Sequence, residues 1–389
     1  MREVSRSRLV LADGREVYVE PSTFARSGSA VLLAGTPNYV WRPVAGRPVA
    51  LEARFGHFGA AIGADGRVSL VPSPLDARLI KHVRVLGRGD GVWDAVFIEL
   101  EPPGWVAGEA GVAARVWHGV VDGRRWLRLE EMPRPTGARV YPGSTPPALI
   151  RRGDTLAWAL PVETPGGQTE AVVYERRNGR WSYELVPTNS PAYLVPAYSD
   201  SLGLVLAVVR ALPPAEENGL YFLVRRHSWQ TLRRPADRVY EPSLTFAGTA
   251  GFLTWRTLLP DEGGMRWEAR AMIGHLEAQD GPIVRLDSSV VHMAAPVSPR
   301  TGTRLWVVDH VGEGGRGNEL RVIRDSAETA VVLTRIPSPF QGFFAAALQS
   351  PVELLIAGPV PGRTETEPGV VTLLLRLRVQ CPRGVGRPD

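Results

Sequence analysis

The feature that most constrains the fold is an internal repeat that runs along most of the 389 residues. Each unit holds a short apolar stretch and a turn, a second and strongly apolar strand, a polar loop rich in Pro, Gly and Glu, and two further strands joined by a tight turn. The second strands are expected to begin near Ala30, Val92, Thr155, Leu204, Phe252, Arg304 and Val352. Their spacing of roughly 50–60 residues is close to that of four-stranded propeller blades.

The repeat units are predicted to consist of strands alone. They are rich in β-branched and aromatic residues, and Gly and Pro stand mostly at their ends, as ladder hydrogen bonding requires. No segment combines a helical period with capping residues. We therefore predict an all-β fold, a single β-propeller with seven four-stranded blades, or six as the alternative. The tryptophans that fall within second strands should pack between blades: Trp93, Trp158, Trp255 and Trp306.

One propeller domain is predicted to span residues 1–381, followed by a C-terminal tail at 382–389. The last unit offers only three strands, and the N-terminal segment 7–20 is a spare strand that could supply the fourth and close the ring. The predicted blades have the following approximate bounds: 22–74, 81–135, 145–188, 191–237, 241–288, 292–338, and 341–380 together with 7–20.

Composition excludes several classes of protein. The single cysteine, Cys381, rules out a disulfide scaffold and a thiolate zinc site. Hydrophobic residues make up 44% of the chain, which is enough for a large core. The longest apolar run, 202–209, is too short to span a bilayer, and no apolar leader is visible at the N-terminus. We expect a soluble cytoplasmic protein, or a secreted one if a leader has been removed.

The charges of the chain divide between the two predicted faces of the ring. The net charge is +5, and Lys81 is the only lysine in an arginine-rich sequence, a bias typical of GC-rich codon usage. Loops between second and third strands carry acids such as Glu101 and Glu109, whereas turns on the opposite face carry arginines such as Arg152 and Arg225. These turns are either simply solvated or form a basic face for an anionic partner. Nucleic acid is not expected, because the basic residues lack interleaved aromatic residues.

Three short motifs stand at the approach to fourth strands: 122–126 (DGRRW), 178–181 (NGRW) and 227–229 (HSW). With these motifs the chain resembles the β-propeller superfamily, and within it the sialidase, or BNR-type, propellers. The likeness covers nearly the whole chain. A complete Asp-box, Ser-x-Asp-x-Gly-x-Thr-Trp, is absent, so the resemblance implies a fold and assigns no catalytic residue.

Propeller geometry predicts where a functional site would lie. Innermost strands line the central channel, and each enters from the face that carries the loops between blades, so side chains just before these strands converge on the axis. The residues at these entrances are Lys81, His82, Tyr193, Tyr240, Glu241, His292 and Gln341. A satisfied polar funnel filled with water is the plain alternative to a ligand site.

The first functional hypothesis is a binding or scaffolding propeller that holds a protein or a glycan on the entrance face. The loops 36–54 and 101–114 would form its rims, and Trp41 and Trp105 could stack on a sugar or another planar ligand. Other ligand-binding candidates at the entrances are Lys81, Tyr193, Tyr240 and Gln341.

The second hypothesis is a glycoside hydrolase or lyase of the sialidase-like type that acts at the axis. Glu241 and an acid from a neighbouring loop would form a carboxylate pair, or His82 and His292 would act with Glu241 as acid, base or metal ligands. No cofactor is predicted, although a divalent metal at the axis is compatible with these three residues. The sequence leaves open whether the protein is an enzyme.

Overall fold

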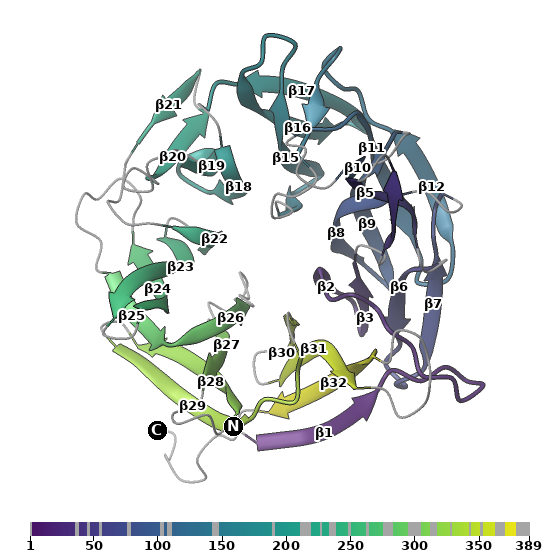
Figure 1. Cartoon of the computed structure of the whole chain (residues 1–389), viewed down its shortest axis with the longest axis vertical. Coiled ribbons are helices and arrows are strands. Elements are labelled where there is room, and N and C mark those ends of the chain that lie inside the picture. The colour runs from purple at the N-terminus through teal and green to yellow at the C-terminus, as the bar shows by residue number, and fades with distance from the viewer. Residues whose placement is uncertain are drawn as a thin grey trace, which may run out of the picture.

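The computed structural model consists of β-sheets arranged around a central opening (Figure 1). It describes residues 2–35, 39–44, 47–53, 57–75, 79–101, 105–106, 111–141, 148–188, 191–210, 219–225, 228–232, 239–247, 250–261, 264–274, 283–294, 305–311, 317–326, 329–341, 344–350, 353–361 and 370–378. All regular elements in these ranges are strands. Nowhere in them is there a helix long and apolar enough to cross a membrane.

Seven four-stranded sheets form the blades. For each blade the strands are named in order from the innermost strand, next to the central opening, to the outermost. Blade 1 contains β2 (Thr23–Ser27), β3 (Ala30–Ala34), β6 (His57–Ile62) and β7 (Val68–Pro72). Blade 2 contains β8 (Ile80–Gly89), β9 (Val92–Leu100), β11 (Ala114–Val121) and β12 (Trp126–Glu131). Blade 3 contains β14 (Ile150–Arg152), β15 (Thr155–Glu163), β16 (Thr169–Arg177) and β17 (Arg180–Val186), and blade 4 contains β18 (Pro191–Ser199), β19 (Gly203–Arg210), β20 (Leu220–Arg225) and β21 (Trp229–Thr231).

The remaining three blades follow the same antiparallel order. Blade 5 contains β22 (Tyr240–Ala247), β23 (Ala250–Asp261), β24 (Gly264–Gly274) and β25 (Ile283–Ser288). Blade 6 contains β26 (Val290–Ala294), β27 (Trp306–Val311), β28 (Asn318–Ser326) and β29 (Thr329–Pro337). Blade 7 contains β30 (Ala345–Ser350), β31 (Glu353–Pro361), β32 (Val370–Arg378) and β1 (Arg2–Arg8). The predicted seven-bladed, all-β propeller is therefore confirmed, and each second strand begins within two residues of its predicted start.

The N-terminal strand closes the ring, as predicted. β1 lies antiparallel to β32, with Arg2 opposite Arg378 and Arg8 opposite Leu373. The Leu9 amide then donates to the Thr372 carbonyl at 2.8 Å. The closing strand lies almost entirely upstream of the predicted segment 7–20, because the chain after Leu9 turns back in a short hairpin in which Val10 pairs with Glu16.

The apolar core lies between the blades rather than at the centre of the ring. The described residues form seven buried clusters, and each cluster joins two neighbouring blades. The predicted role of the second-strand tryptophans is confirmed: Trp93, Trp158, Trp255 and Trp306 are at most 1% exposed and each packs against the preceding blade. The Trp93 indole also donates to the Ala25 carbonyl of blade 1 at 2.9 Å.

Two features depart from a regular propeller. The innermost strand of blade 3 is split, because β13 (Arg139–Val140) pairs with the far end of β15 while β14 pairs with its beginning. A further three-stranded sheet joins β4 (Tyr39–Val44) and β5 (Arg47–Ala53), inserted in blade 1, to β10 (Trp105–Val106), inserted in blade 2. The two loops expected to form separate rims of the entrance face are therefore tied together by backbone pairing.

Gly87 in blade 2 lies so close to the backbone of blade 1 that an added methyl group would not fit. A Cβ atom at Gly87 in β8 would lie 1.9 Å from the Arg26 carbonyl oxygen in β2. We expect Gly87→Ala to lower the free energy of unfolding by about 1–3 kcal/mol, since overpacking forces the backbone apart. Gly166→Ala, in an exposed turn where the nearest atom is 3.9 Å away, should change it little in the same denaturant titration. Equal stability of the two variants would contradict this account.

Candidate functional site

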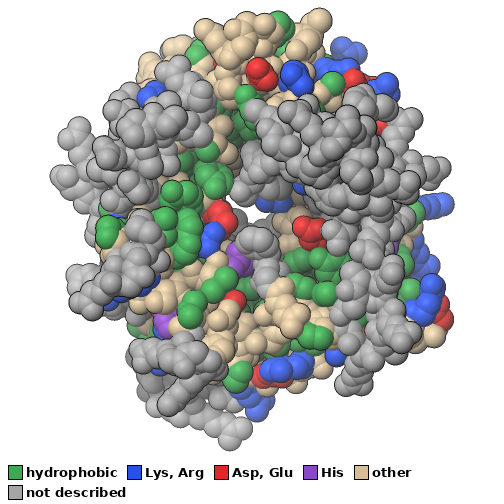
Figure 2. Space-filling model, viewed as in Figure 1, with side chains coloured by type: hydrophobic (Ala, Val, Ile, Leu, Met, Phe, Trp, Pro, Cys, Tyr) green, Lys and Arg blue, Asp and Glu red, His purple; other side chains and the backbone are tan. Residues whose placement is uncertain are grey.

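The candidate site is a cavity of about 480 Å³ on the propeller axis, at the entrance end of the innermost strands. All seven blades line it, with residues from or just before β2, β8, β14, β18, β22, β26 and β30. The polar and aromatic residues in its wall are Glu20, Ser22, Thr23, Phe24, Arg84, Tyr193, Glu241, Ser243, His292 and Phe344. In Figure 2 hydrophobic, acidic, basic and histidine side chains border the central opening.

Bulges at the start of four innermost strands bring these side chains to the axis. In β8 the register shifts between Lys81 and Arg84, and in β22 it shifts in the same way between Tyr240 and Ser243. β18 and β26 have similar shifts just before Tyr193 and His292. An extra residue in a strand re-aims the side chains that follow it, and bulges are common beside functional sites. Consistent with local strain, His82 and Glu241 adopt φ angles of 53° and 49°.

Glu241 reaches the cavity with its side chain held by an arginine. Its Oε1 accepts a hydrogen bond from Nη2 of Arg256 in β23 at 2.6 Å. The Arg256 guanidinium also donates to the Val291 carbonyl of blade 6, and it lies over the Trp267 ring with its Cζ 4.6 Å from the ring centroid. Arg256 is therefore fixed on three sides, and this fixes the carboxylate beside it.

His292 is a neutral ring with a defined tautomer. Its Nε2 lies 2.9 Å from the Phe344 carbonyl oxygen, which can only accept, so Nε2 carries the proton. Burial lowers the pKa of His292, and the positive Arg256 lowers it further, although the Phe344 carbonyl and Glu241 oppose the shift. The ring is therefore neutral near pH 7, and Nδ1 keeps its lone pair.

A second carboxylate and two cations lie at the opposite side of the ring. Burial raises the pKa of Glu20, which precedes blade 1, while the neighbouring Lys81 acts in the other direction. Burial likewise lowers the pKa of Lys81, against the attraction of Glu20. Burial also lowers the pKa of Arg84 to about 10, so this cavity-lining guanidinium stays charged near neutral pH. Its Nη1 donates to the Ser22 carbonyl at 2.7 Å.

His82 is not among the residues that line the cavity. Its side chain is 1% exposed, and its Nε2 donates to the Tyr141 carbonyl of blade 3 at 2.7 Å. Glu241 and His292 line one cavity, whereas His82 packs between blades 2 and 3. Across the described ranges, no three His, Cys, Asp or Glu side chains converge as a metal site requires.

The other entrance residues have different surroundings. Tyr193 lines the cavity, whereas the Tyr240 ring packs edge-on against Trp267, with 4.8 Å between centroids. Gln341 is exposed, and its backbone amide donates to the Pro359 carbonyl. Trp41 and Trp105 both pair through their backbones with Ala50, but their side chains lie outside the described part of the chain.

Sequence reasoning missed Glu20 and Arg84. Glu20 could have been found by the entrance rule used for the other blades, because it stands three residues before β2. Arg84 gives no such signal, since its position in the cavity depends on the bulge that precedes it in β8.

Comparison with known proteins supports the fold at low sequence identity. No protein-family model and no curated protein matches the sequence. The polysaccharide lyase Uly1 superposes with a TM-score of 0.50 at 9% identity, covering 96% of this chain and 93% of that one. An α-L-arabinofuranosidase from Fusarium graminearum, solved with an iminosugar inhibitor, gives 0.50 at 13% identity over 77% of this chain and 93% of its own.

Sialidases are also among the structural neighbours. The Trypanosoma rangeli sialidase gives a TM-score of 0.46 at 10% identity, covering 96% of this chain. This chain spans 60% of the length of that sialidase. The predicted seven-bladed propeller itself is shown by the sheet topology.

The buried His82 predicts a loss of stability in acid. Burial, reinforced by Lys81 and Arg84, lowers its pKa to about 4 from 6.5 despite the Tyr141 carbonyl. Between these values the unfolded chain binds a proton that the folded protein does not, so the free energy of unfolding decreases as the pH falls through this interval. Over this pH interval the free energy of unfolding decreases by an amount on the order of 3 kcal/mol.

Comparing the native protein with His82→Asn tests this assignment. Asn tolerates a positive φ angle and does not titrate in this pH range, so the variant removes the imidazole without straining the backbone. Denaturant titrations near neutral pH and at about pH 4.5 should show a smaller loss of stability for the variant than for the native protein. Identical losses would refute the assignment, because the remaining acid-titrating groups are common to both.

Proposed function

We propose that the protein binds a glycan and holds one of its sugar units in the axial cavity. The observation that carries the proposal is that polar side chains from several blades, already fixed by the fold, surround a cavity of about 480 Å³. This volume lies within the roughly 300–1,000 Å³ typical of small-molecule sites, which combine apolar walls with a few placed polar groups.

The polar groups suit the hydroxyls of a sugar. The Glu241 carboxylate and Nδ1 of His292 would accept hydrogen bonds, and the Arg84 guanidinium would donate them. Tyr193 would offer its ring to the apolar face of the sugar. Since Arg256 and the Phe344 carbonyl already orient Glu241 and His292, little conformational entropy would be lost on binding.

Two of the structural neighbours are named as proteins that act on carbohydrates. A polysaccharide lyase and an arabinofuranosidase share the architecture at a TM-score of 0.50. Their ligands do not transfer to this chain through the fold, because one fold hosts many functions. The proposal therefore depends on the residues of the cavity.

Glycan binding predicts a specific effect of Glu241→Gln. A panel of oligosaccharides screened by thermal shift should contain at least one that raises the unfolding temperature, since a ligand of the folded state stabilises it by mass action. Isothermal titration of that oligosaccharide should then show affinity at least about tenfold weaker for Glu241→Gln, as a hydrogen bond to a charged group is lost.

The matched control is Glu131→Gln, which neutralises an exposed glutamate on the outer strand of blade 2 and should leave affinity unchanged. Circular dichroism and the unfolding temperature of the free variants would exclude misfolding. Equal affinities of the native protein and Glu241→Gln, or no stabilising oligosaccharide, would argue against an axial glycan site.

Hydrolysis of the bound glycan is a second candidate function. It is favoured by two cavity-lining carboxylates from blades 1 and 5 with different environments. Burial raises the pKa of Glu20, which favours a proton donor, whereas Glu241 forms an ion pair with Arg256. Glycoside hydrolysis uses such a pair, with one carboxyl as general acid and the other as nucleophile or base.

Leaving-group dependence distinguishes the two proposed roles. Glu20→Gln should abolish cleavage of a natural glycosidic bond but retain activity on an activated aryl glycoside, whose leaving group needs no proton. Glu241→Gln should lose both activities, and native activity should fall as the pH rises through the raised pKa of Glu20. Binding without cleavage by the native protein would leave the glycan-binding proposal standing and eliminate the hydrolase.

A further inference from the structure

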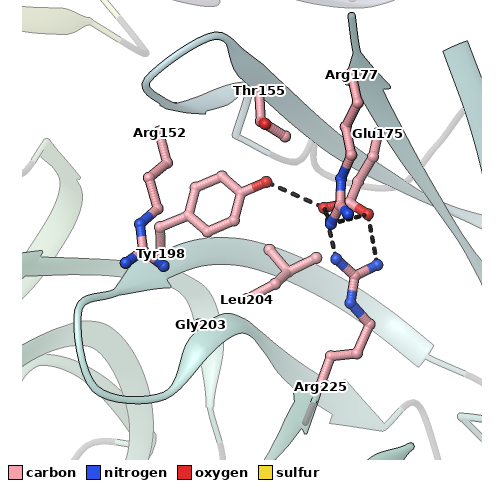
Figure 3. A pocket seen from close by; sticks show the side chains of 8 residues that line it. All are labelled: Arg152, Thr155, Glu175, Arg177, Tyr198, Gly203, Leu204 and Arg225. Carbon is pink, nitrogen blue, oxygen red and sulfur yellow. Dashed lines mark hydrogen bonds and ion pairs between the residues drawn. The ribbon is translucent and has the colours of Figure 1, made fainter. Parts of the chain in front are cut away.

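A separate groove lies on the opposite face, between blades 3 and 4. It has a volume of about 500 Å³ and lies where the turn between β14 and β15 meets the turn between β18 and β19 (Figure 3). The described residues that line it are Arg152, Thr155, Glu175, Arg177, Tyr198, Gly203, Leu204 and Arg225. Three of these eight are arginines, and only Glu175 is acidic.

A buried ion pair forms the floor of the groove. The Glu175 side chain is 8% exposed, and its two oxygens lie 2.6 Å from Nη2 and Nη1 of Arg225 in the next blade. Tyr198 donates to the same carboxylate at 3.2 Å, as Figure 3 shows. Although burial raises the pKa of Glu175, Arg225 and Arg177 more than offset this and hold it below its usual value.

The groove contains more positive charge than this ion pair requires. Arg177 is 61% exposed and reaches Glu175 through Nη2 alone, at 3.1 Å. Arg152 is exposed and makes no ion pair or side-chain hydrogen bond within the described part of the chain. Glu175 and Glu184, whose Oε2 lies 3.7 Å from Nη1 of Arg225, offset two of the three guanidinium groups, so one net positive charge remains around the groove.

Several arginines elsewhere on this face form ion pairs. Arg88 and Arg151 pair with Asp94, and Arg125 pairs with Asp122. The exposed Asp154 and Asp200 stand in the two turns that border the groove, but they do not line it.

We infer that this groove is a second binding site, specific for a phosphate group on a small molecule. A phosphate carries about −1.5 to −2 charges near neutral pH, so it would be attracted by the exposed guanidinium groups of Arg152 and Arg177. Guanidinium groups present donors in a planar fork that suits phosphate oxygens. The groove is larger than one phosphate, and Tyr198 and Leu204 provide an apolar wall for the part of the ligand that carries it.

Calorimetric titration with two probes, inorganic phosphate and a sugar phosphate, tests the site in the full chain at low ionic strength. We expect saturable binding at one site, weakened about tenfold or more by Arg152→Gln and by Arg177→Gln. Arg152→Gln leaves the Glu175 ion pair intact, so its folding should be unaffected. Tighter binding of the sugar phosphate would identify an ester as the ligand, and equal binding would identify the free ion.

Arg124→Gln is the matched control, because Arg124 is an exposed arginine in the turn before the fourth strand of blade 2, and the described residues give it no ion pair. It should bind phosphate like the native protein, and so should Glu241→Gln at the axis. Absence of saturable binding would overturn the inference. Equal weakening by Arg124→Gln and Arg152→Gln would also overturn it, since it would indicate diffuse attraction to surface charge.

Discussion

Apolar packing between neighbouring blades is the interaction on which the rest of the structure depends. Both faces of every blade carry buried apolar residues, so no blade can bury its surface alone, and each needs a partner on either side. A ring satisfies this requirement for all seven blades once the last cluster closes, where Leu355 of blade 7 packs against Val31 and Leu33 of blade 1. β1 pairs with the edge of β32 and ties the two ends of the chain together. The central channel follows from this arrangement, because the innermost strands surround an axis that no side chain is required to fill.

This logic explains why the fold could be predicted from the sequence. A second strand that is apolar on both faces and carries an inward tryptophan, such as Trp93 or Trp158, is a strong signal that recurs with the period of the blade. The additional sheet of β4, β5 and β10 was not predictable in the same way. Its strand β10 has only two residues, Pro43 and Pro48 stand within β4 and β5, and its pairing joins segments of different blades. The split innermost strand of blade 3 was missed because β13 contains only two residues and has no apolar run.

Of the residues predicted at the strand entrances, only some line the axial cavity. His82 and Glu241 follow equivalent bulges and have nearly the same φ angle, yet Glu241 lines the cavity while His82 is bonded to the next blade. The difference arises from the neighbouring blade: Tyr141, beside the interrupted strand of blade 3, presents a carbonyl oxygen to His82. No pattern within the sequence of one blade contains that information. Arg84 lines the cavity for the related reason that the bulge shifts the register before it.

Both candidate sites contain an ion pair between a carboxylate and a guanidinium group. In one site the arginine is the more buried member, and in the other it is the glutamate. At the axis, Arg256 is 10% exposed and is held by a carbonyl and an indole ring, so the ion pair leaves the Glu241 carboxylate, 26% exposed, facing the cavity. In the groove between blades 3 and 4, the carboxylate is the buried partner, and the more exposed Arg177 faces outward. A buried ion pair contributes little net stability, because desolvation offsets the attraction. Its physical consequence is that it orients the two side chains. The fold fixes the more buried side chain of the pair, and that side chain holds the more exposed one in position to present its charge to a ligand. A hydroxyl-rich neutral ligand suits the first arrangement, and an anion suits the second.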